Sequence, residues 1–474
     1  MKRLLTMLAL AWTIGAHAAD SHMHRALQAI FEMDRKGFET HLALTDNKAE
    51  RAYLQEYRRL MLYTANNSEA NYDLYLDASD RAFDALGSAP ADRQPTMRCN
   101  LLLHKCMVEL SKNNTWTGGM LFWKSYKAFK EGEKVASGQP GQLKLRGIYN
   151  VLLAQIPDKW KTLAGFIGFG QGNLEHGLAQ IEDYYLKVRD IEGLNQESQL
   201  LAFVNFFLSN SRNMNPRLEK RMQQSPSPVV VYTYILTIGK DNRGATADSL
   251  LATLPAHAFE QFPLLMHQKG KIALRRLDTR SAIACLDRFL ATYTGITCRA
   301  NALTLKAWAL KLQGRDAEGQ AAAQKAADVE RFSASDANSA ADARRYAQTD
   351  TTLLKARLLT EYGLYDKALA ALDGYRPDSA TAIEYHFRRG RICQLKGLDA
   401  QAIEHYDKAI AQATADKRFH GPYAALYAAQ IKVETADMTA ASAYLDKAAR
   451  LNNGEYQKDI EQRISLLRKK AGVR

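Results

Sequence analysis

Two glycines near the C-terminal end, Gly363 and Gly397, stand 34 residues apart in two similar stretches of sequence. The second stretch has a glycine seven residues before its turn and small or aromatic residues after it, at Gly390, Ala402, Tyr406 and Ala409. This spacing predicts a helix, a turn at the second glycine and another helix, with small residues where the helices approach closely. A repeat of this length restricts the fold to stacked helix hairpins, because one hairpin alone cannot bury its apolar face.

Less regular copies of this pattern extend over roughly residues 263–451. One unit carries Leu277 where the turn glycine is expected, and the next carries Gly314 there. The stretch resembles the tetratricopeptide-repeat family, which implies an all-α chain folded as an α-solenoid of stacked antiparallel helix hairpins.

The N-terminal half is also predicted to be helical, although it lacks the repeat signature. Residues 123–178 contain Trp123-Lys124 and Ile156-Pro157, and they end in a glycine-rich stretch around Gly170 and Gly172. This segment resembles the central part of the tetratricopeptide repeat protein 39 family, which includes the yeast inclusion-body-clearance proteins. The resemblance implies a non-enzymatic protein linked to lipid handling and protein turnover.

The first residues are typical of a secretory signal peptide. Lys2 and Arg3 precede an apolar run from Leu4 to Ile14, and Ala16-His17-Ala18 forms a small-x-small cleavage site. The apolar run is too short to span a bilayer, which needs about 20 residues. We therefore expect cleavage after Ala18 and export to the periplasm, in soluble form or peripherally attached to a membrane.

These patterns divide the chain into four predicted parts. They are a signal peptide (1–18), an N-terminal region of degenerate helical repeats (19–258), a tetratricopeptide-repeat region (259–451) and a C-terminal capping helix (452–474). The cap is predicted because Ile460, Ile464 and Leu467 fall on one helical stripe. Residues 331–350 interrupt the repeats and are interpreted as a lengthened helix or an exposed connection.

The charge of the chain is strongly positive. Its formal charge is +13, and removal of Lys2 and Arg3 would leave +11. A basic exported protein is attracted to anionic lipid, acidic glycan or acidic protein surfaces, although an ordinary solvated basic surface is the alternative. Nucleic acid is not expected as a partner in the predicted compartment.

Motifs of catalysis are absent from the sequence. No G-x-S-x-G, H-E-x-x-H or phosphate-binding loop pattern occurs, and the 11 histidines are scattered. We therefore expect a protein that is not an enzyme, with no catalytic residue, metal site or cofactor. An active site assembled from distant residues of a solenoid is the alternative.

Candidate binding residues follow from resemblance to peptide-binding tetratricopeptide domains, whose first helices line the concave groove. The position immediately after the small residue of each unit is occupied by Lys271, Trp308, Arg357 and Arg391. The position one turn earlier is occupied by Phe387 in one of these units. A basic stripe with apolar contacts suits an acidic, partly hydrophobic protein segment, because arginine offers forked donors to carboxylates. Charge reversal at Arg357 and Arg391 is expected to abolish partner binding without unfolding. The alternative is that these residues only pack within and between repeats.

The leading hypothesis is thus an exported, non-enzymatic scaffold or adaptor that holds an envelope protein or complex in its groove. A carrier of lipid or another hydrophobic ligand at the cell envelope is the alternative. It is suggested by the apolar segments between residues 147 and 169 and by the lipid links that the family resemblance implies.

Overall fold

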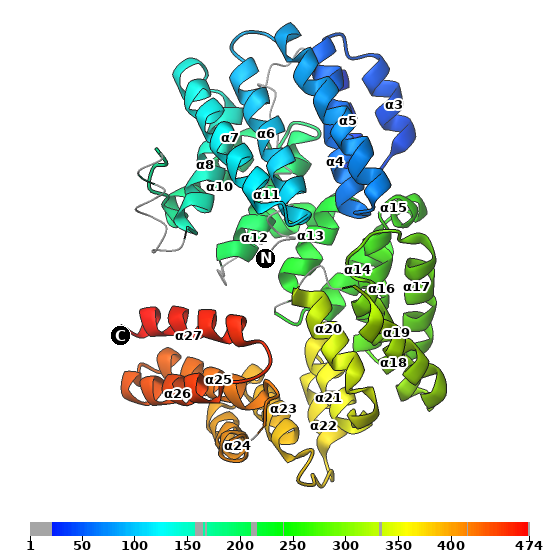
Figure 1. The fold of residues 1–474 in the computed structure, drawn as a ribbon, viewed down its shortest axis with the longest axis vertical. Coiled ribbons are helices and arrows are strands. Elements are labelled where there is room, and N and C mark those ends of the chain that lie inside the picture. The colour runs from blue at the N-terminus through cyan, green and yellow to red at the C-terminus, as the bar shows by residue number, and fades with distance from the viewer. Residues whose placement is uncertain are drawn as a thin grey trace. The chain divides into compact units, whose positions relative to one another are not determined.

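The computed structural model of the 474-residue chain describes residues 21–156, 165, 168–209, 216–239, 241–330, 334–414 and 416–472. These residues form 25 α-helices and two short 3-10 helices, and no strand occurs among them (Figure 1). The prediction of an all-α fold built from paired helices is confirmed. The predicted signal peptide, residues 1–18, lies outside the described residues.

The chain divides into two compact units. Unit 1 comprises residues 1–241, 246–269 and 287–297, and unit 2 comprises residues 242–245, 270–286 and 298–474. Helices α16 (Pro263–Arg275) and α17 (Thr279–Thr292) each contribute residues to both units. The division therefore falls inside a helix hairpin, whereas the sequence pattern placed a boundary between residues 258 and 259.

Unit 1 is built mainly from helices that pack in neighbouring pairs, namely α2 with α3, α4 with α5, α6 with α7, and α8 with α10. Its helices are α2 (Ser21–Phe31), α3 (Arg35–Ala43), α4 (Lys48–Ala65), α5 (Glu69–Ala85), η1 (Leu86–Ser88), α6 (Gln94–Ser111), α7 (Thr115–Val135), α8 (Pro140–Ala154), α10 (Leu174–Val188), α11 (Leu194–Ser209), α12 (Pro216–Gln224), α13 (Pro228–Ile238), α14 (Gly244–Thr253) and α15 (Ala256–Gln261).

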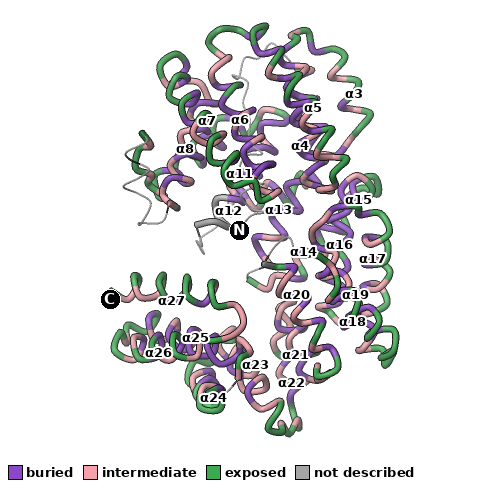
Figure 2. The backbone as a smooth tube through the Cα atoms, viewed as in Figure 1, coloured by how far each residue is buried: buried purple, intermediate pink, exposed green. Residues whose placement is uncertain are grey.

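Two helices of unit 1, α11 and α13, are enclosed by their neighbours. Residues 194–204 of α11 are all buried or half-buried, and nearly every residue of α13 is buried (Figure 2). The two helices pack against each other, and α11 also contacts α2 and α10. Helix α13 needs such a position, because it is apolar on nearly every side and has no polar face to turn towards water. Helix α11 is enclosed although it carries polar side chains such as Glu197. No described helix is both long enough and apolar enough to cross a membrane.

Unit 2 has the same paired construction, with α18 against α19, α21 against α22, α23 against α24, and α25 against α26. Besides the ends of α16 and α17, it contains α18 (Arg299–Leu312), α19 (Asp316–Asp328), α20 (Ala334–Arg344), η2 (Tyr346–Gln348), α21 (Thr351–Tyr362), α22 (Tyr365–Leu372), α23 (Ala382–Leu395), α24 (Asp399–Gln412), α25 (His420–Glu434), α26 (Met438–Leu451) and α27 (Gln457–Ala471).

The piece predicted as a lengthened helix or an exposed connection, residues 331–350, contains a separate helix instead. Helix α20 packs against both α18 and α19, and Ala340 and Ala343 on it are buried. The small side chains that made this segment look like a connection allow it to lie close to its neighbours.

The turn positions of the repeats have the backbone conformation that the spacing predicts. Gly363 and Gly397 have φ values of +100° and +76°, in the left-handed region that glycine adopts without steric cost. The corresponding turns at Leu277 and Ala436 have φ values of +67° and +60°. These two units therefore keep the repeat geometry at a cost in backbone strain.

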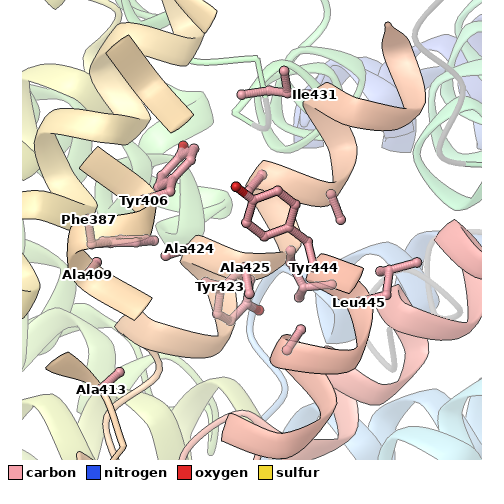
Figure 3. Packing of buried hydrophobic residues seen from close by; sticks show 14 of the residues in the cluster. Phe387, Tyr406, Ala409, Ala413, Tyr423, Ala424, Ala425, Ile431, Tyr444 and Leu445 are labelled. Carbon is pink, nitrogen blue, oxygen red and sulfur yellow. The ribbon is translucent and has the colours of Figure 1, made fainter. Parts of the chain in front are cut away.

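The predicted close approach of the two helices in the second unit is also present. A Cβ atom at Gly390 would lie 2.8 Å from the Tyr406 ring, so only glycine fits there. Figure 3 shows the surrounding cluster, with Phe387, Tyr406 and Ala409 on one side of the view and Tyr444 and Leu445 on the other. Helix α27 covers the end of this cluster with buried Ile460 and Ile464, as the predicted cap requires.

Candidate partner-binding site

The five residues predicted to bind a partner all lie on the first helices of hairpins. Lys271 is on α16, Trp308 on α18 and Arg357 on α21, while Phe387 and Arg391 are one turn apart on α23. All five belong to unit 2. They fall into two groups, distinguished by the aromatic ring that each arginine covers.

The first group is centred on Trp308. The guanidinium carbon of Arg357 lies 4.6 Å from the centre of the Trp308 ring, a cation–π contact between the first helices of consecutive repeats. Trp308 is only 6% exposed, and its buried indole Nε1 has no hydrogen-bond partner among the described residues. Arg357 is half-buried. Trp308 is thus a packing residue, and the Arg357 guanidinium covers one face of its ring.

Two carboxylates hold the cations of this group in place. Arg357 Nε donates to Glu361 Oε1 at 3.0 Å, and Arg275 Nε donates to Glu361 Oε2 at 3.1 Å. On the other side, Asp342 Oδ2 lies 3.5 Å from Arg357, and Asp342 Oδ1 lies 2.9 Å from Arg345. A continuous chain of ion pairs therefore joins α16, α20 and α21.

The pKa values show how closely these charges are placed. Burial alone would raise the pKa of Glu361, but Arg275, Arg357 and Lys271 overcome it and hold that pKa well below its usual range. The pKa of Lys271 is lowered to about 8, first by repulsion from Arg275 and then by burial. Burial would lower the pKa of Arg357, yet Asp342 and Glu361 raise it above its usual value. Glu361 and Arg357 therefore remain charged at neutral pH, while the lowered pKa of Lys271 makes it easier to discharge.

We call this set the cation cluster, defined as Lys271, Arg275, Trp308, Asp342, Arg345, Arg357 and Glu361. Its members are four cations, two carboxylates and one aromatic ring. The surplus of positive charge in this cluster is suited to an anionic group.

The second group surrounds Tyr427 on α25. Arg391 covers the Tyr427 ring at 4.2 Å, and its guanidinium donates to Gln394 Oε1 at 2.8 Å. Phe387, only 5% exposed, stacks on the same ring with a centroid distance of 6.1 Å. Phe387 is therefore part of the packing between repeats. Arg391 remains half-buried and has an amide oxygen, not a carboxylate, as its described hydrogen-bond acceptor.

The sequence prediction missed four of the six charged members of the cation cluster. Arg275 and Glu361 each stand four residues after a predicted residue, so the helical spacing could have identified them on the same face. Asp342 and Arg345 come from the segment that had been interpreted as a lengthened helix or a connection. Their position depends on the packing of α20, which no local pattern indicates.

Within the described part of the chain, no three His, Cys, Asp or Glu side chains lie close enough together to hold a metal ion. A hollow of unit 2, about 620 Å³ in volume, lies between α26 and α27 and is lined by residues that include Glu461, Arg468 and Lys469. This lining is largely charged and polar, unlike a pocket for acyl chains.

Comparison with known proteins gives a weak structural likeness. No family model matches the sequence, and no curated protein matches it. The structure is similar to that of the human IFIT1 dimer with m7Gppp-AAAA, at 15% identity and a TM-score of 0.34, over 98% of this chain and 99% of that one. It is also similar to the human IFIT1 dimer with PPP-AAAA, at 14% identity and a TM-score of 0.30, over 96% and 95%.

Two statements from the sequence change as a result. The specific resemblance to the tetratricopeptide repeat protein 39 family is not supported, while the coarser one, a tetratricopeptide-like helical solenoid, agrees with the fold. The exclusion of nucleic acid as a partner is wrong, because both similar structures hold a nucleic-acid ligand. That exclusion rested on the predicted export, and the predicted signal peptide lies outside the described residues.

Proposed function

We propose that this chain is a non-enzymatic binding protein that holds an acidic, partly apolar segment of a partner protein against the first helices of unit 2. The observation that supports this proposal is the composition of the cation cluster. The cluster holds four cations, one of which covers Trp308, and only Asp342 and Glu361 among the cluster members offset them. A carboxylate entering the cluster would gain charge-assisted hydrogen bonds from these cations.

Lys271 is the cation of the cluster that would gain most from the carboxylate of such a ligand. Repulsion from Arg275 lowers its pKa to about 8, so an additional carboxylate beside it would relieve that repulsion. Because the ion pairs of Arg275 and Arg357 are already made within the protein, the cluster is rigid before a ligand arrives. A ligand then loses less free energy to the ordering of side chains.

The test is fluorescence anisotropy with the full chain and a short fluorescein-labelled peptide of Glu, Tyr and Leu. Binding is expected to weaken about tenfold in Lys271→Gln, as for loss of one charged hydrogen bond. The matched control is Lys325→Gln, which removes the same charge from an exposed position on α19 and should leave binding unchanged. Added salt should weaken binding, since the contact is ionic.

Two results would contradict this proposal. Equal loss of binding in Lys271→Gln and Lys325→Gln would mean that only the net charge of the surface matters. Tight, Lys271-dependent binding of a labelled RNA oligonucleotide with no binding of the peptide would mean that the cluster recognises phosphates of nucleic acid instead.

We further propose that the protein is exported through residues 1–18, as the sequence pattern predicts. Residues 1–20 lie outside the described residues, so this proposal rests on the sequence alone. N-terminal sequencing of the protein recovered from the periplasmic fraction of a bacterial host should begin at Ala19. Recovery of the uncleaved chain from the cytoplasm would contradict it.

A further inference from the structure

The segment between α26 and α27 lies against the cation cluster. Residues 452–456, Asn-Asn-Gly-Glu-Tyr, form this connection, and we call them the strap. We propose that the strap is an internal ligand of the cation cluster, and that it competes for the cluster with partner segments in which a carboxylate stands next to an aromatic ring. This inference rests on the proposed function and names the chemistry of the partner.

Glu455 supplies the carboxylate of the strap. One of its oxygens forms an ion pair with the Arg345 guanidinium, which also pairs with Asp342 at 2.9 Å. The other oxygen, Oε2, is buried and has no hydrogen-bond partner among the described residues. Glu455 therefore adds a third anion to a cluster with four cations, yet leaves half of its carboxylate unsatisfied. A ligand free to adjust its position could satisfy both oxygens.

Tyr456 supplies the aromatic part of the strap. Its ring lies 5.1 Å from Phe419 and 6.2 Å from Tyr423 between centroids, so it is held by unit 2 on one side. Burial and the charge of Asp342 raise the pKa of its phenol to about 12, while Arg357 and Arg345 oppose that increase. The side chain therefore lies near the same arginines that the proposed partner would contact.

The backbone of the strap fits its place closely. Gly454 approaches the chain at Lys417 so tightly that a Cβ atom there would lie 1.9 Å from the Lys417 carbonyl oxygen. The next residue, Glu455, donates its backbone N–H to that same oxygen at 3.1 Å. Any side chain at position 454 must therefore push the strap away from this contact.

The strap also has two features that favour its displacement from the cation cluster. Tyr456 has a φ of +59°, a left-handed conformation that is unfavourable for a bulky residue. Helix α27 is attached independently, because Ile460 and Ile464 on it are buried in the cluster around α25 and α26. Displacement of residues 452–456 therefore need not undock the helix that follows. Strain relief and the unsatisfied Glu455 oxygen both favour exchange for a better ligand.

The experiment measures binding of the labelled Glu-Tyr-Leu peptide to the full chain with three strap compositions. Glu455→Gln removes the competing charge, and Gly454→Ala displaces the strap while keeping Glu455. Both variants are expected to bind the peptide about tenfold more tightly than the unmodified chain, because the strap no longer occupies the cluster. Glu461→Gln on α27 is the control, since it removes the same charge from an exposed position outside the strap.

A second arm uses an unlabelled peptide with the sequence of residues 450–458. It should compete with the labelled peptide on Glu455→Gln at lower concentration than on the unmodified chain. Circular dichroism and thermal unfolding confirm that each variant remains folded.

The outcomes separate this inference from the proposed function. If the unmodified chain binds the peptide in a Lys271-dependent way but neither strap variant binds more tightly, the strap is a structural connection and this inference is wrong. If no variant and no unmodified chain binds the peptide, the proposed function fails and the inference fails with it. An equal gain in Glu461→Gln would also overturn it, since the effect would then be general electrostatics.

Discussion

The guanidinium of Arg357 lies over Trp308 at 4.6 Å and is held between the carboxylates of Glu361 and Asp342. The arginine that the sequence predicts to bind a partner, on the first helix of a repeat, is therefore also a member of an ion-pair chain within unit 2. Arg391, one repeat later, covers Tyr427 and donates to Gln394, with no carboxylate in its described hydrogen bonds. Two positions that are equivalent in the sequence thus have different electrostatic surroundings.

Charge reversal should consequently have different effects at these two arginines. Arg357→Glu would place a third carboxylate beside Asp342 and Glu361, and it should destabilise the protein by about 3 kcal/mol. Arg391→Glu loses a cation–π contact and should cost about 1 kcal/mol. Urea unfolding of the two variants measures the difference. Equal midpoints would mean that the ion-pair chain of Arg357 contributes no more to stability than the aromatic contact of Arg391. The expectation from the sequence, that charge reversal at Arg357 leaves the protein folded, would then hold.

Introducing glycine at a repeat turn that lacks it should increase the stability of the protein. Ala436 is exposed and has a φ of +60°, so Ala436→Gly should stabilise the protein by roughly 1 kcal/mol through relief of the left-handed strain. Gly397→Ala is the matched change in the opposite direction, because no atom would obstruct the new Cβ and only the φ of +76° opposes it. Thermal unfolding should show a higher midpoint for the first variant and a lower one for the second. A lower midpoint for Ala436→Gly and a higher one for Gly397→Ala would show that glycine flexibility in the unfolded chain dominates.

Unit 1 contains a fully buried ion pair. The effects of substituting its two members on stability should be strongly coupled. Lys144 Nζ on α8 lies 3.4 Å from Glu197 Oε1 on α11, and Tyr184 donates to the other oxygen of Glu197. Lys144→Met alone should cost about 3–5 kcal/mol, because it leaves a buried carboxylate without its cation. The double variant Lys144→Met with Glu197→Gln should cost less than the sum of the single variants. Additive costs in a double-mutant cycle would show that the two groups do not interact.

The same pair predicts how stability depends on pH. Burial raises the pKa of Glu197 to about 7 from 4.5, so the folded protein keeps a proton that the unfolded chain releases. Between pH 5 and 7 the native state thus binds more protons, and this group makes stability fall as pH rises, by on the order of 2 kcal/mol. Burial lowers the pKa of Lys144 to about 8 from 10.5, so its contribution rises with pH between 8 and 10.5.

Urea unfolding at a series of pH values measures this dependence. Glu197→Gln should remove the decline between pH 5 and 7. Because Glu197 raises the pKa of Lys144, this variant should also shift the titration of Lys144 to lower pH. A decline of the same size in Glu197→Gln would assign it to other groups. An increase of stability over that interval in the unmodified chain, relative to the variant, would mean that Glu197 is ionised in the folded protein with a lowered pKa.

The repeat spacing alone determined the class of fold and several of its local details. Helix hairpins, the left-handed turns at Gly363 and Gly397 and the close contact at Gly390 follow from relations among residues within one unit of 34. The same local reasoning placed the cap on Ile460 and Ile464. Such features depend on neighbours in sequence, which the period of a helix brings to one face.

The composition of the candidate site was decided only by the tertiary structure. Asp342 contacts the arginine on α21, and Arg345 and Glu455 extend the same chain of ion pairs. All three come from segments outside the repeat pattern, through the packing of α20 and the path of the strap. The burial of α11 in unit 1 is of the same kind, since its position depends on α2, α10 and α13 together. Charges and small residues in a sequence show what a segment can contact. Which partner it contacts depends on the sum of weak packing energies over many distant residues, and no single stretch of sequence contains that sum.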